Sequence, residues 1–248
     1  MFVDRFDGRA LNYSRYRPRY PRRILRLLEL EAGLDQKSVV ADVGSGTGIL
    51  SELFLSHGNS VLSVEPNDEM RRIAETMLAK HGDRFASVKG TAESTSLPNN
   101  AVDLVAVGQA LHWFEPEKAR REFRRILRGR RPVCVVFNDR KSDGPVEVEY
   151  GRLVLEYAVD RGNTPEVDDP YLGRFLGNDQ FKRFSIPNRQ VLGYSGLLGR
   201  LASASYMPGP GSRSWDALTR DVSEVVRSLG VNGRVTLHYV TRVYIGHV

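Results

Sequence analysis

A glycine-rich turn is the feature of this sequence with the clearest chemical meaning. Residues 39–43 are a short β-branched run, residues 47–57 repeat apolar side chains at helical spacing, and Gly44, Gly46 and Gly48 lie where the two segments meet. Glycine allows a tight turn with positive φ and lets a ligand approach the backbone closely. The start of the helix also offers free backbone N–H groups. We therefore predict that this turn binds an anionic or polar ligand.

The residues around the turn argue against a dinucleotide. The dinucleotide pattern Gly-x-Gly-x-x-Gly has its third glycine where this sequence has Ile49. Asp42 precedes the first glycine by two positions and would repel a pyrophosphate, whereas it suits an ammonium group, or an ordered water near a carboxylate. Glu65, at the end of the next predicted strand, is able to accept hydrogen bonds from both hydroxyls of a ribose. The combination of the glycine turn with Glu65 is much rarer than either feature alone.

The elements that must position these residues alternate between strand and helix over residues 1–138. The predicted strands are 38–43, 60–65, 85–89, 102–107 and 132–137, and the predicted helices are 24–33, 47–57, 67–77 and one that begins near Pro116. Before them, residues 6–23 predict an extended or turn segment, because they contain Pro18 and Pro21. This alternation is typical of an α/β fold with a parallel sheet that helices cover on both faces.

Beyond residue 138 the pattern is looser, and we predict one domain with an inserted helical part. The predicted elements are a helix at 145–159, a polar turn region at 163–170, the end of a strand at 190–192, helices at 194–202 and 214–229, and a strand at 235–245. The single domain, 1–248, divides into an N-terminal lid segment and helix (1–35), a cofactor-binding core (36–138), a helical insertion (139–185) and C-terminal strands and helices (186–248).

Several motifs together resemble those of class I S-adenosylmethionine-dependent methyltransferases of the type 11 subgroup. The matching segments are 42–48, 64–70, 90–93, 97–98 and 102–105, and segments 13–21, 108–114, 203–208 and 239–246 are similar to a branch that includes enzymes resembling trans-aconitate methyltransferase. The resemblance covers nearly the whole chain. It implies a Rossmann-like, doubly wound, mostly parallel seven-stranded sheet of order 3-2-1-4-5-7-6, with an antiparallel last strand and an inserted helical lid region.

The resemblance also implies S-adenosylmethionine as the cofactor. Its predicted binding residues are Tyr13, Tyr16, Arg17, Asp42, Gly44, Ser45, Gly46, Thr47, Glu65, Pro66, Asn67, Met70, Thr91, Ala92, Glu93, Gln109 and Ala110. The glycine turn would contact the methionine part, Glu65 the ribose, Ala92 and Glu93 the adenine, and Gln109 the region of the sulfonium. One departure is the loop 128–132, which reads Arg-Gly-Arg-Arg-Pro where the family usually has Lys-Pro-Gly-Gly, normally far from the cofactor.

Methyl transfer from a sulfonium is an in-line displacement, so holding donor and acceptor together supplies most of the rate. Aromatic faces favour the sulfonium charge, and Trp113, Tyr13 and Tyr16 are candidates, although such aromatics are often simply core residues. His112 is the candidate base or hydrogen-bond partner, because it follows the fourth strand at the edge where ligands bind. A lone histidine is, however, often structural.

We expect a small-molecule acceptor, such as a carboxylate or a hydroxyl compound. The predicted lid consists of residues 13–20, the region after Asn138 and the loop 206–213. The predicted substrate contacts are Tyr20, Trp113, Tyr206 and Arg213. Arg17, Arg19 or Arg213 would hold an acceptor carboxylate, because arginine suits bidentate anion recognition.

The charge balance leaves two alternatives open. The net charge is +6 and the sequence pI is about 9.5. Much of the excess lies in one arginine-rich segment, 120–131, which reads either as a solvated helix face or as an anion-attracting surface. The alternatives are therefore a nucleic-acid methyltransferase or binding protein, which the lack of a recognisable RNA-binding segment disfavours, and a non-catalytic scaffold with the same fold.

The remaining features of the sequence predict a cytoplasmic enzyme that is a monomer or a homodimer and contains no metal. Cys134 is the one cysteine, which rules out an internal disulfide, and its place in a strand predicts a small buried hydrophobe. No apolar run is long enough for a membrane span, and the first residues lack the features of a secretory signal. No Cys/His cluster has metal-ligand spacing, and no Asn-Pro-Pro-Tyr motif follows strand four, which disfavours amino-methylation of bases.

Overall fold

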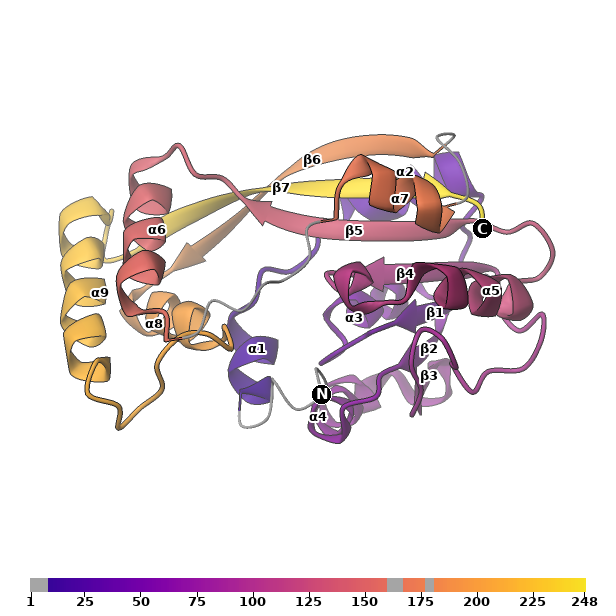
Figure 1. The fold of residues 1–248 in the computed structure, drawn as a ribbon, viewed down its shortest axis with the longest axis horizontal. Helices are drawn as coiled ribbons and strands as arrows, with labels where there is room; N and C mark the ends of the chain where they lie inside the picture. The colour runs from indigo at the N-terminus through magenta and orange to yellow at the C-terminus, as the bar shows by residue number, and fades with distance from the viewer. Residues whose placement is uncertain (1–8, 160–166, 177–180) are drawn as a thin grey trace.

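A mixed seven-stranded sheet organises the part of the chain that this computed structural model describes, residues 9–159, 167–176 and 181–248. The strands run in the order β3-β2-β1-β4-β5-β7-β6 (Figure 1). β1 to β5 pair in parallel, and β7 is antiparallel to both β5 and β6. The bounds are β1 Val39–Val43, β2 Ser60–Val64, β3 Phe85–Val88, β4 Leu104–Gly108, β5 Val133–Arg140, β6 Lys182–Leu192 and β7 Val235–Gly246. This topology confirms the predicted fold.

Helices cover both faces of the sheet, because successive strand side chains point to opposite sides. In β1, Val40 packs in a cluster with α2, α3 and α4, whereas Ala41 packs in a cluster with α5 and α7. The helix bounds are α1 Ala10–Tyr16, α2 Arg23–Ala32, α3 Ile49–His57, α4 Asp68–Leu78, α5 Pro116–Ile126, α6 Pro145–Tyr157, α7 Asp169–Leu176, α8 Tyr194–Ala202 and α9 Trp215–Leu229, with 3₁₀ turns η2 Ala79–Arg84 and η3 Leu111–Trp113.

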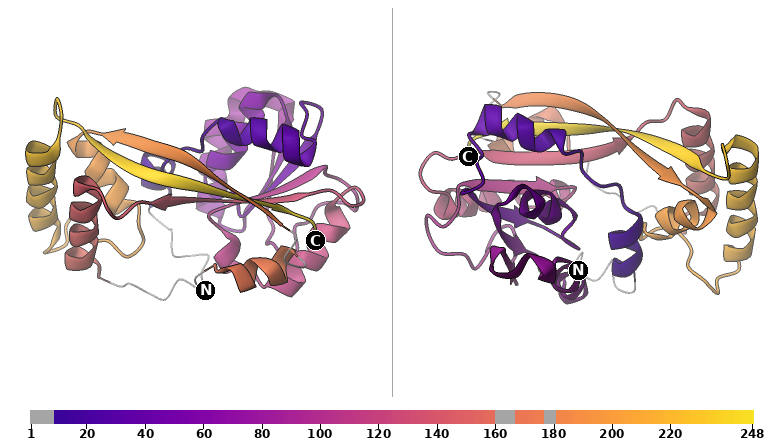
Figure 2. Two further views of the ribbon diagram at one scale, coloured as in Figure 1. Left: turned by 90° about the horizontal axis from the view of Figure 1, so that it is seen from above. Right: turned by 180° about the vertical axis from the view of Figure 1, so that it is seen from behind.

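The ends of β5, β6 and β7 extend beyond this core to a distal group of helices, α6, α8 and α9 (Figures 1 and 2). These helices form a separate apolar cluster with the distal ends of β6 and β7, including Leu192, Leu237 and Tyr239. α1 lies between the core and the distal part and contacts α4 on one side and α8 on the other. No helix within the described ranges combines the length and apolarity that crossing a bilayer requires.

Some elements differ from those that the sequence predicts. The predicted extended segment 6–23 is wrong over residues 10–16, which form α1. Burial of Ala10 and Ser14, together with packing of the Tyr16 ring where a Gly199 Cβ would lie, stabilises a helix that is too short to form alone. Tertiary contacts of this kind are difficult to predict from the local sequence.

The second half of the sheet is also longer than the sequence predicts. β5 continues past Phe137 to Arg140, and β6 begins at Lys182 rather than contributing only residues 190–192. Pro187 makes β6 difficult to predict from the sequence. The strand nevertheless forms because it lies at the sheet edge, where a residue without an N–H is tolerated. Within the predicted turn 163–170, residues 163–166 lie outside the described ranges, and Asp169 begins the unpredicted helix α7.

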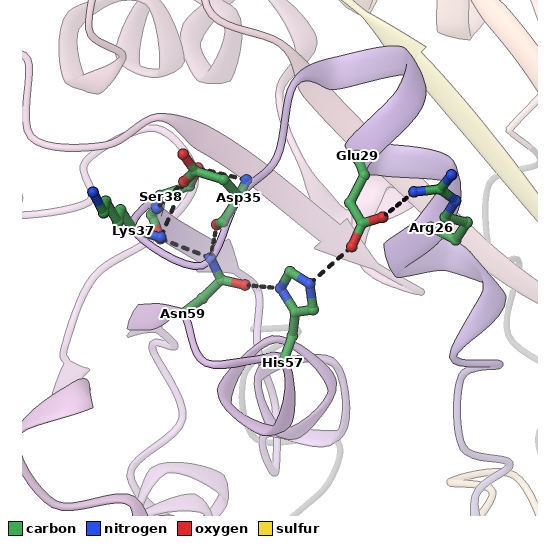
Figure 3. Close-up of polar contacts among 7 residues, drawn as sticks. All are labelled: Arg26, Glu29, Asp35, Lys37, Ser38, His57 and Asn59. Atoms are coloured by element: carbon green, nitrogen blue, oxygen red, sulfur yellow. Dashed lines mark hydrogen bonds and ion pairs between the residues drawn. The ribbon is translucent and has the colours of Figure 1, made fainter.

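A buried polar network fastens the loop before β1 to the end of α3 (Figure 3). Asn59 is fully buried, and its Nδ2 donates to the carbonyl oxygens of Asp35 at 2.7 Å and Ser38 at 2.9 Å. Its Oδ1 lies 2.8 Å from Nδ1 of His57, whose Nε2 lies 3.1 Å from Oε1 of Glu29 in α2. The network therefore fixes the start of β1, the strand that leads into the glycine turn.

Replacing Asn59 with alanine is expected to lower the free energy of unfolding by about 1–3 kcal/mol, because two buried carbonyl groups lose their donor. Urea unfolding followed by circular dichroism measures this change. Lys37→Ala, an exposed change in the same loop, should alter the free energy of unfolding by less than about 0.5 kcal/mol. An Asn59→Ala protein as stable as the wild type would contradict this account of the network.

Candidate functional site

A cavity of about 640 Å³ lies where β1, β2, β4 and β5 end beside α1. This edge of an α/β sheet is the usual place for a ligand, and the volume is in the range of small-molecule sites. The lining residues are Tyr13, Arg17, Pro18, Tyr20, Asp42, Gly44, Ser45, Gly46, Ile49, Leu50, Glu65, Pro66, Asn67, Met70, Thr91, Ala92, Glu93, Gly108, Gln109, Ala110, Trp113, Phe114, Glu115 and Asn138.

The glycine turn has the backbone conformation that its sequence predicts. Gly44, Gly46 and Gly48 have φ of +69°, +55° and +81°. A Cβ at Gly44 would lie 2.6 Å from the Cβ of Ala110, an atom that the backbone holds rigidly. Gly44 therefore has a positive φ, which favours glycine, and a contact with the segment after β4 that leaves no room for a Cβ.

The N–H groups of the turn residues Gly44, Ser45 and Gly46 are already hydrogen-bonded. The N–H groups of Gly44 and Ser45 both donate to the carbonyl of Val64, at 2.9 and 3.1 Å. The N–H of Gly46 donates to Oε2 of Glu65 at 2.9 Å. These bonds join the turn to the end of β2, so a ligand here would contact the turn chiefly through its other atoms.

Glu65 is held rigidly at the end of β2. Its Oε2 accepts from Gly46, and its Oε1 accepts from the N–H of Asn67 at 2.9 Å. The side chain is buried, and burial raises the pKa of Glu65 although both N–H groups favour the charged form. Asn67 in turn accepts from the N–H of Met70 and begins α4, as predicted. A fixed carboxylate thus lines the cavity.

Asp42 and Ser45 bring unsatisfied polar atoms to the same cavity. Asp42 is fully buried; its Oδ2 accepts from the hydroxyl of Ser51 at 2.6 Å, whereas its Oδ1 has no partner within the described residues. Burial raises the pKa of Asp42 to about 7. The Ser45 hydroxyl is also buried without a partner in that part of the chain. Such atoms fit a polar ligand that brings a hydrogen-bond donor, as an ammonium group does.

Gln109, just after β4, has a left-handed backbone with φ of +56°, which is uncommon for a residue with a side chain. Its N–H donates to the carbonyl of Val136, and its Oε1 accepts from the N–H of Asn138, both at 3.0 Å. These two bonds to β5 hold the strained conformation. Strain of this kind clusters at functional sites.

Asn138 ties the N-terminal segment to the sheet. Its Oδ1 accepts from Thr241 at 2.5 Å and from Nδ2 of Asn188 at 3.1 Å. Its Nδ2 donates to the carbonyl of Pro18 at 3.4 Å, and Asn188 donates to the carbonyl of Arg19 at 2.9 Å. Polar side chains of β5, β6 and β7 therefore hold this segment against the cavity.

The same segment supplies four residues of the cavity lining, Tyr13, Arg17, Pro18 and Tyr20. The guanidinium carbon of Arg17 lies 4.7 Å from the centroid of the Tyr13 ring. The Tyr20 hydroxyl occupies the space next to Gly108, where a Cβ would lie 2.6 Å from it. Burial raises the pKa of Tyr20 well above its usual value, so this phenol remains protonated at neutral pH.

The structure gathers most of the predicted site residues around this one cavity. Among the predicted cofactor residues, Tyr16 and Thr47 are outside its lining: Tyr16 packs on Gly199, and Thr47 borders a neighbouring cavity. Of the predicted substrate residues, Tyr20 and Trp113 line it, whereas Tyr206 and Arg213 do not. His112 is also outside the lining; burial lowers its pKa to about 4, and its ring packs 4.5 Å from that of Trp113.

Other lining residues lie outside the predicted set: Pro18, Ile49, Leu50, Gly108, Phe114, Glu115 and Asn138. Asn138 had a detectable signal, because a polar residue interrupts the apolar run 133–137 at the carboxyl end of a strand. The position of Phe114 depends on α7, because Tyr171 donates to the carbonyls of Leu111 and Phe114 at 3.0 and 2.9 Å.

Part of the core is similar to known methyltransferases. Residues 41–130 match the family model described as a methyltransferase domain. An uncharacterized methyltransferase of Mycobacterium bovis is 36% identical over 142 residues, which are 57% of this chain and 55% of that protein. An uncharacterized methyltransferase-like protein of Schizosaccharomyces pombe is 28% identical over 156 residues, 62% of this chain and 59% of that one. The chain thus matches little more than half the length of these relatives.

The whole fold also has counterparts among solved structures. A candidate type II methyltransferase from Anaeromyxobacter dehalogenans superposes with a TM-score of 0.68 at 21% identity, covering 94% of this chain and 98% of that one. At this identity the match concerns the fold alone. The structural match also includes the distal strands and helices, which lie outside residues 41–130.

Proposed function

Because residues 41–130 match the methyltransferase domain family and the whole chain shares its fold with a solved candidate methyltransferase, we propose that it transfers a methyl group from S-adenosylmethionine to a small-molecule acceptor. The observation that carries the proposal is the cavity at the strand ends, where Asp42, Gly44 and Glu65 meet. Fold alone does not fix an activity, so the argument depends on these side chains.

The residues present fit this cofactor. Glu65 has a fixed carboxylate suited to the two ribose hydroxyls. The unpartnered Oδ1 of Asp42 and the hydroxyl of Ser45 suit the charged end of the methionine part, with an ammonium donor opposite Asp42. Met70 and Ala92 are buried apolar residues of the lining, on the side where we place the adenine.

The remaining lining residues would position the acceptor. When bound, the cofactor would supply an activated methyl group on its sulfonium. Tyr13 and Trp113 offer aromatic faces that favour a positive charge. His112, with a pKa of about 4, is neutral at pH 7 and a weak base. We therefore assign the rate chiefly to positioning.

A small-molecule acceptor fits the structure better than a nucleic acid does. Part of the arginine-rich helix α5 and the loop after it is ion-paired: Arg125 with Glu122 at 2.7 Å and Arg128 with Asp103 at 2.8 Å. Such pairing favours a solvated face over a nucleic-acid surface. The cavity, in contrast, lies beneath the N-terminal segment, which suits a small substrate.

Methyl transfer tests the proposal. Protein is incubated with S-adenosylmethionine labelled in its methyl group and with pools of small carboxylic acids and phenols. We expect label in one pool together with an equal amount of S-adenosylhomocysteine, and no transfer by a Glu65→Ala variant. Transfer to added RNA or DNA instead would contradict the small-molecule acceptor, and no transfer to any pool would favour a non-catalytic scaffold.

Affinity for S-adenosylhomocysteine is expected to rise with pH through about 7. Pairing with an ammonium group needs an ionised Asp42, which is protonated below its pKa of about 7. Affinity should fall by up to about tenfold for each pH unit below that value, and binding near pH 6.5 should release a proton. Because this folded-state pKa is raised, the unliganded protein should instead lose stability as pH rises through the same range.

Calorimetric titrations in buffers of different ionisation enthalpy measure both the affinity and the proton release. Asp42→Asn should abolish the proton release and flatten the affinity profile. A wild-type affinity that does not change between about pH 5.5 and 7.5 would argue against a pairing role for Asp42.

A further inference from the structure

A second cavity, of about 370 Å³, lies between the N-terminal segment and helices α3 and α4. Its volume is also in the range of small-molecule sites. It shares Tyr20 and Ile49 with the main cavity, but Asp42 and Glu65 do not line it. A ligand in this second cavity would therefore not use the carboxylates that we assign to the cofactor.

The charges that line the second cavity do not balance. Its cations are Arg19, Arg22 and Lys80, and its one carboxylate is that of Glu52, whose Oε1 already accepts from Nζ of Lys80 at 2.9 Å. Arg19 donates to a backbone carbonyl at 3.3 Å, and among the described residues neither Arg19 nor Arg22 has a carboxylate in contact. Both arginines are exposed and thus able to reach a ligand. Two positive charges are left for an anion.

Two helices begin at this cavity without a capping side chain. Arg22 is the N-cap residue of α2 and Gly48 that of α3, and both line the cavity. The first N–H groups of a helix lack intrahelical partners and carry partial positive charge. An arginine at an N-cap adds to this charge instead of opposing it, and α2 has no acidic residue in its first turn. A bound anion would compensate the charge at both helix starts.

A buried hydroxyl gives an independent indication of a ligand. Thr47, directly before the N-cap of α3, lines the second cavity and is only 3% exposed. Its Oγ1 has no hydrogen-bond partner in the part of the chain that the structure describes. Buried polar atoms without partners are uncommon, because they cost free energy. An acceptor oxygen of a ligand would satisfy this hydroxyl.

We propose that the second cavity binds the phosphate group of a small phosphomonoester. A phosphomonoester carries a charge of about −1.5 to −2 at pH 7 and offers several acceptor oxygens. This charge matches the two unbalanced arginines, and arginine suits phosphate because it donates two parallel hydrogen bonds. Leu53, Met77 and Leu78 line the same cavity and offer apolar surface to the organic part of the ligand.

The proposal gives two predicted site residues a different place. Arg19, one of the arginines predicted to hold an acceptor carboxylate, and Thr47, a predicted cofactor residue, line the second cavity and not the main one. The inference goes beyond the proposed methyl transfer and does not depend on it.

The test is calorimetric titration with phenyl phosphate, inorganic phosphate and phenol in a phosphate-free buffer, with and without saturating S-adenosylhomocysteine. We expect phenyl phosphate to bind equally well in both conditions. Inorganic phosphate should bind at least about fivefold more weakly, because it lacks an apolar part, and phenol should give no binding heat.

Variants locate the bound phosphate. Arg19→Met and Arg22→Met should each weaken phenyl phosphate binding by about tenfold, and Thr47→Val by about threefold or more. Arg23→Met changes the exposed arginine next to Arg22, which does not line the cavity, and should have no effect. Thermal unfolding confirms that each variant is folded.

Several results would overturn the inference. These are no binding of phenyl phosphate by the wild type, its displacement by S-adenosylhomocysteine, or unchanged affinity in Arg19→Met and Arg22→Met. An equal loss in Arg23→Met would indicate general attraction to a basic surface, and equal affinity for inorganic phosphate would exclude the phosphomonoester. Because the unliganded protein is also titrated, a failure of S-adenosylhomocysteine to bind would count against the proposed function alone.

Discussion

Alanine at Gly44 is expected to weaken binding of S-adenosylhomocysteine by at least about 100-fold, a loss of roughly 2.7 kcal/mol. Gly44 has φ of +69°, a conformation that costs a residue with a Cβ about 1–2 kcal/mol. The new Cβ would also lie 2.6 Å from the Cβ of Ala110, so either the turn or the segment after β4 must move. Both segments line the cavity, and calorimetric titration measures the loss.

Two other glycines separate the clash from backbone strain. Gly46 has φ of +55°, but among the described residues a Cβ there would meet only the Met70 sulfur, at 3.5 Å. Gly46→Ala should therefore lower the affinity by about tenfold or less. Gly33, after α2, has φ of +65°, and in the described part of the chain no atom lies within 4 Å of where its Cβ would be. Gly33→Ala should therefore lower stability by roughly 1 kcal/mol and leave affinity unchanged. Equal affinities for Gly44→Ala and Gly33→Ala would contradict the steric argument.

Alanine at Glu65 is expected to weaken the same binding by about 100-fold or more. The variant loses a charged acceptor for two ribose hydroxyls, and each hydrogen bond to a charged group contributes about 1.5–3 kcal/mol. It also leaves the N–H groups of Gly46 and Asn67 without their present acceptor, which loosens both turns. Titration with S-adenosylhomocysteine gives the affinity, and thermal unfolding confirms that the variant is folded.

Two variants serve as controls for Glu65. Glu65→Gln keeps the shape and one acceptor oxygen but not the charge, so its affinity should lie between those of the wild type and Glu65→Ala. Glu117→Ala changes a glutamate in the first turn of α5 and should bind as the wild type does. If Glu65→Ala retained wild-type affinity, the ribose would have another partner.

The core of the site was predictable because its residues are local in sequence. The glycine turn requires positive φ at three nearby positions, and the structure has it at Gly44, Gly46 and Gly48. Glu65 and the Asn67 cap follow a strand whose apolar pattern is clear, and both lie where that pattern places them. The alternation of strands and helices then predicts that the strand ends meet at one edge.

The rest of the site depends on contacts between residues far apart in the chain. α1 forms because its residues pack on α8, and Asn138 reaches the cavity because β5 continues beyond its apolar run. Arg200 lies within a short helix whose sequence gives no sign that the residue is buried beside Arg17. The spacing of residues predicts neither the packing of α1 on α8 nor the burial of Arg200.

Calorimetric titration of the wild-type protein with S-adenosylhomocysteine tests the central claim most directly. The account predicts saturable binding of one molecule per chain with a dissociation constant of roughly micromolar order, and a matching rise in the thermal unfolding temperature. A folded protein that gives neither binding heat nor thermal stabilisation would contradict the claim that this cavity holds the cofactor of a methyltransferase.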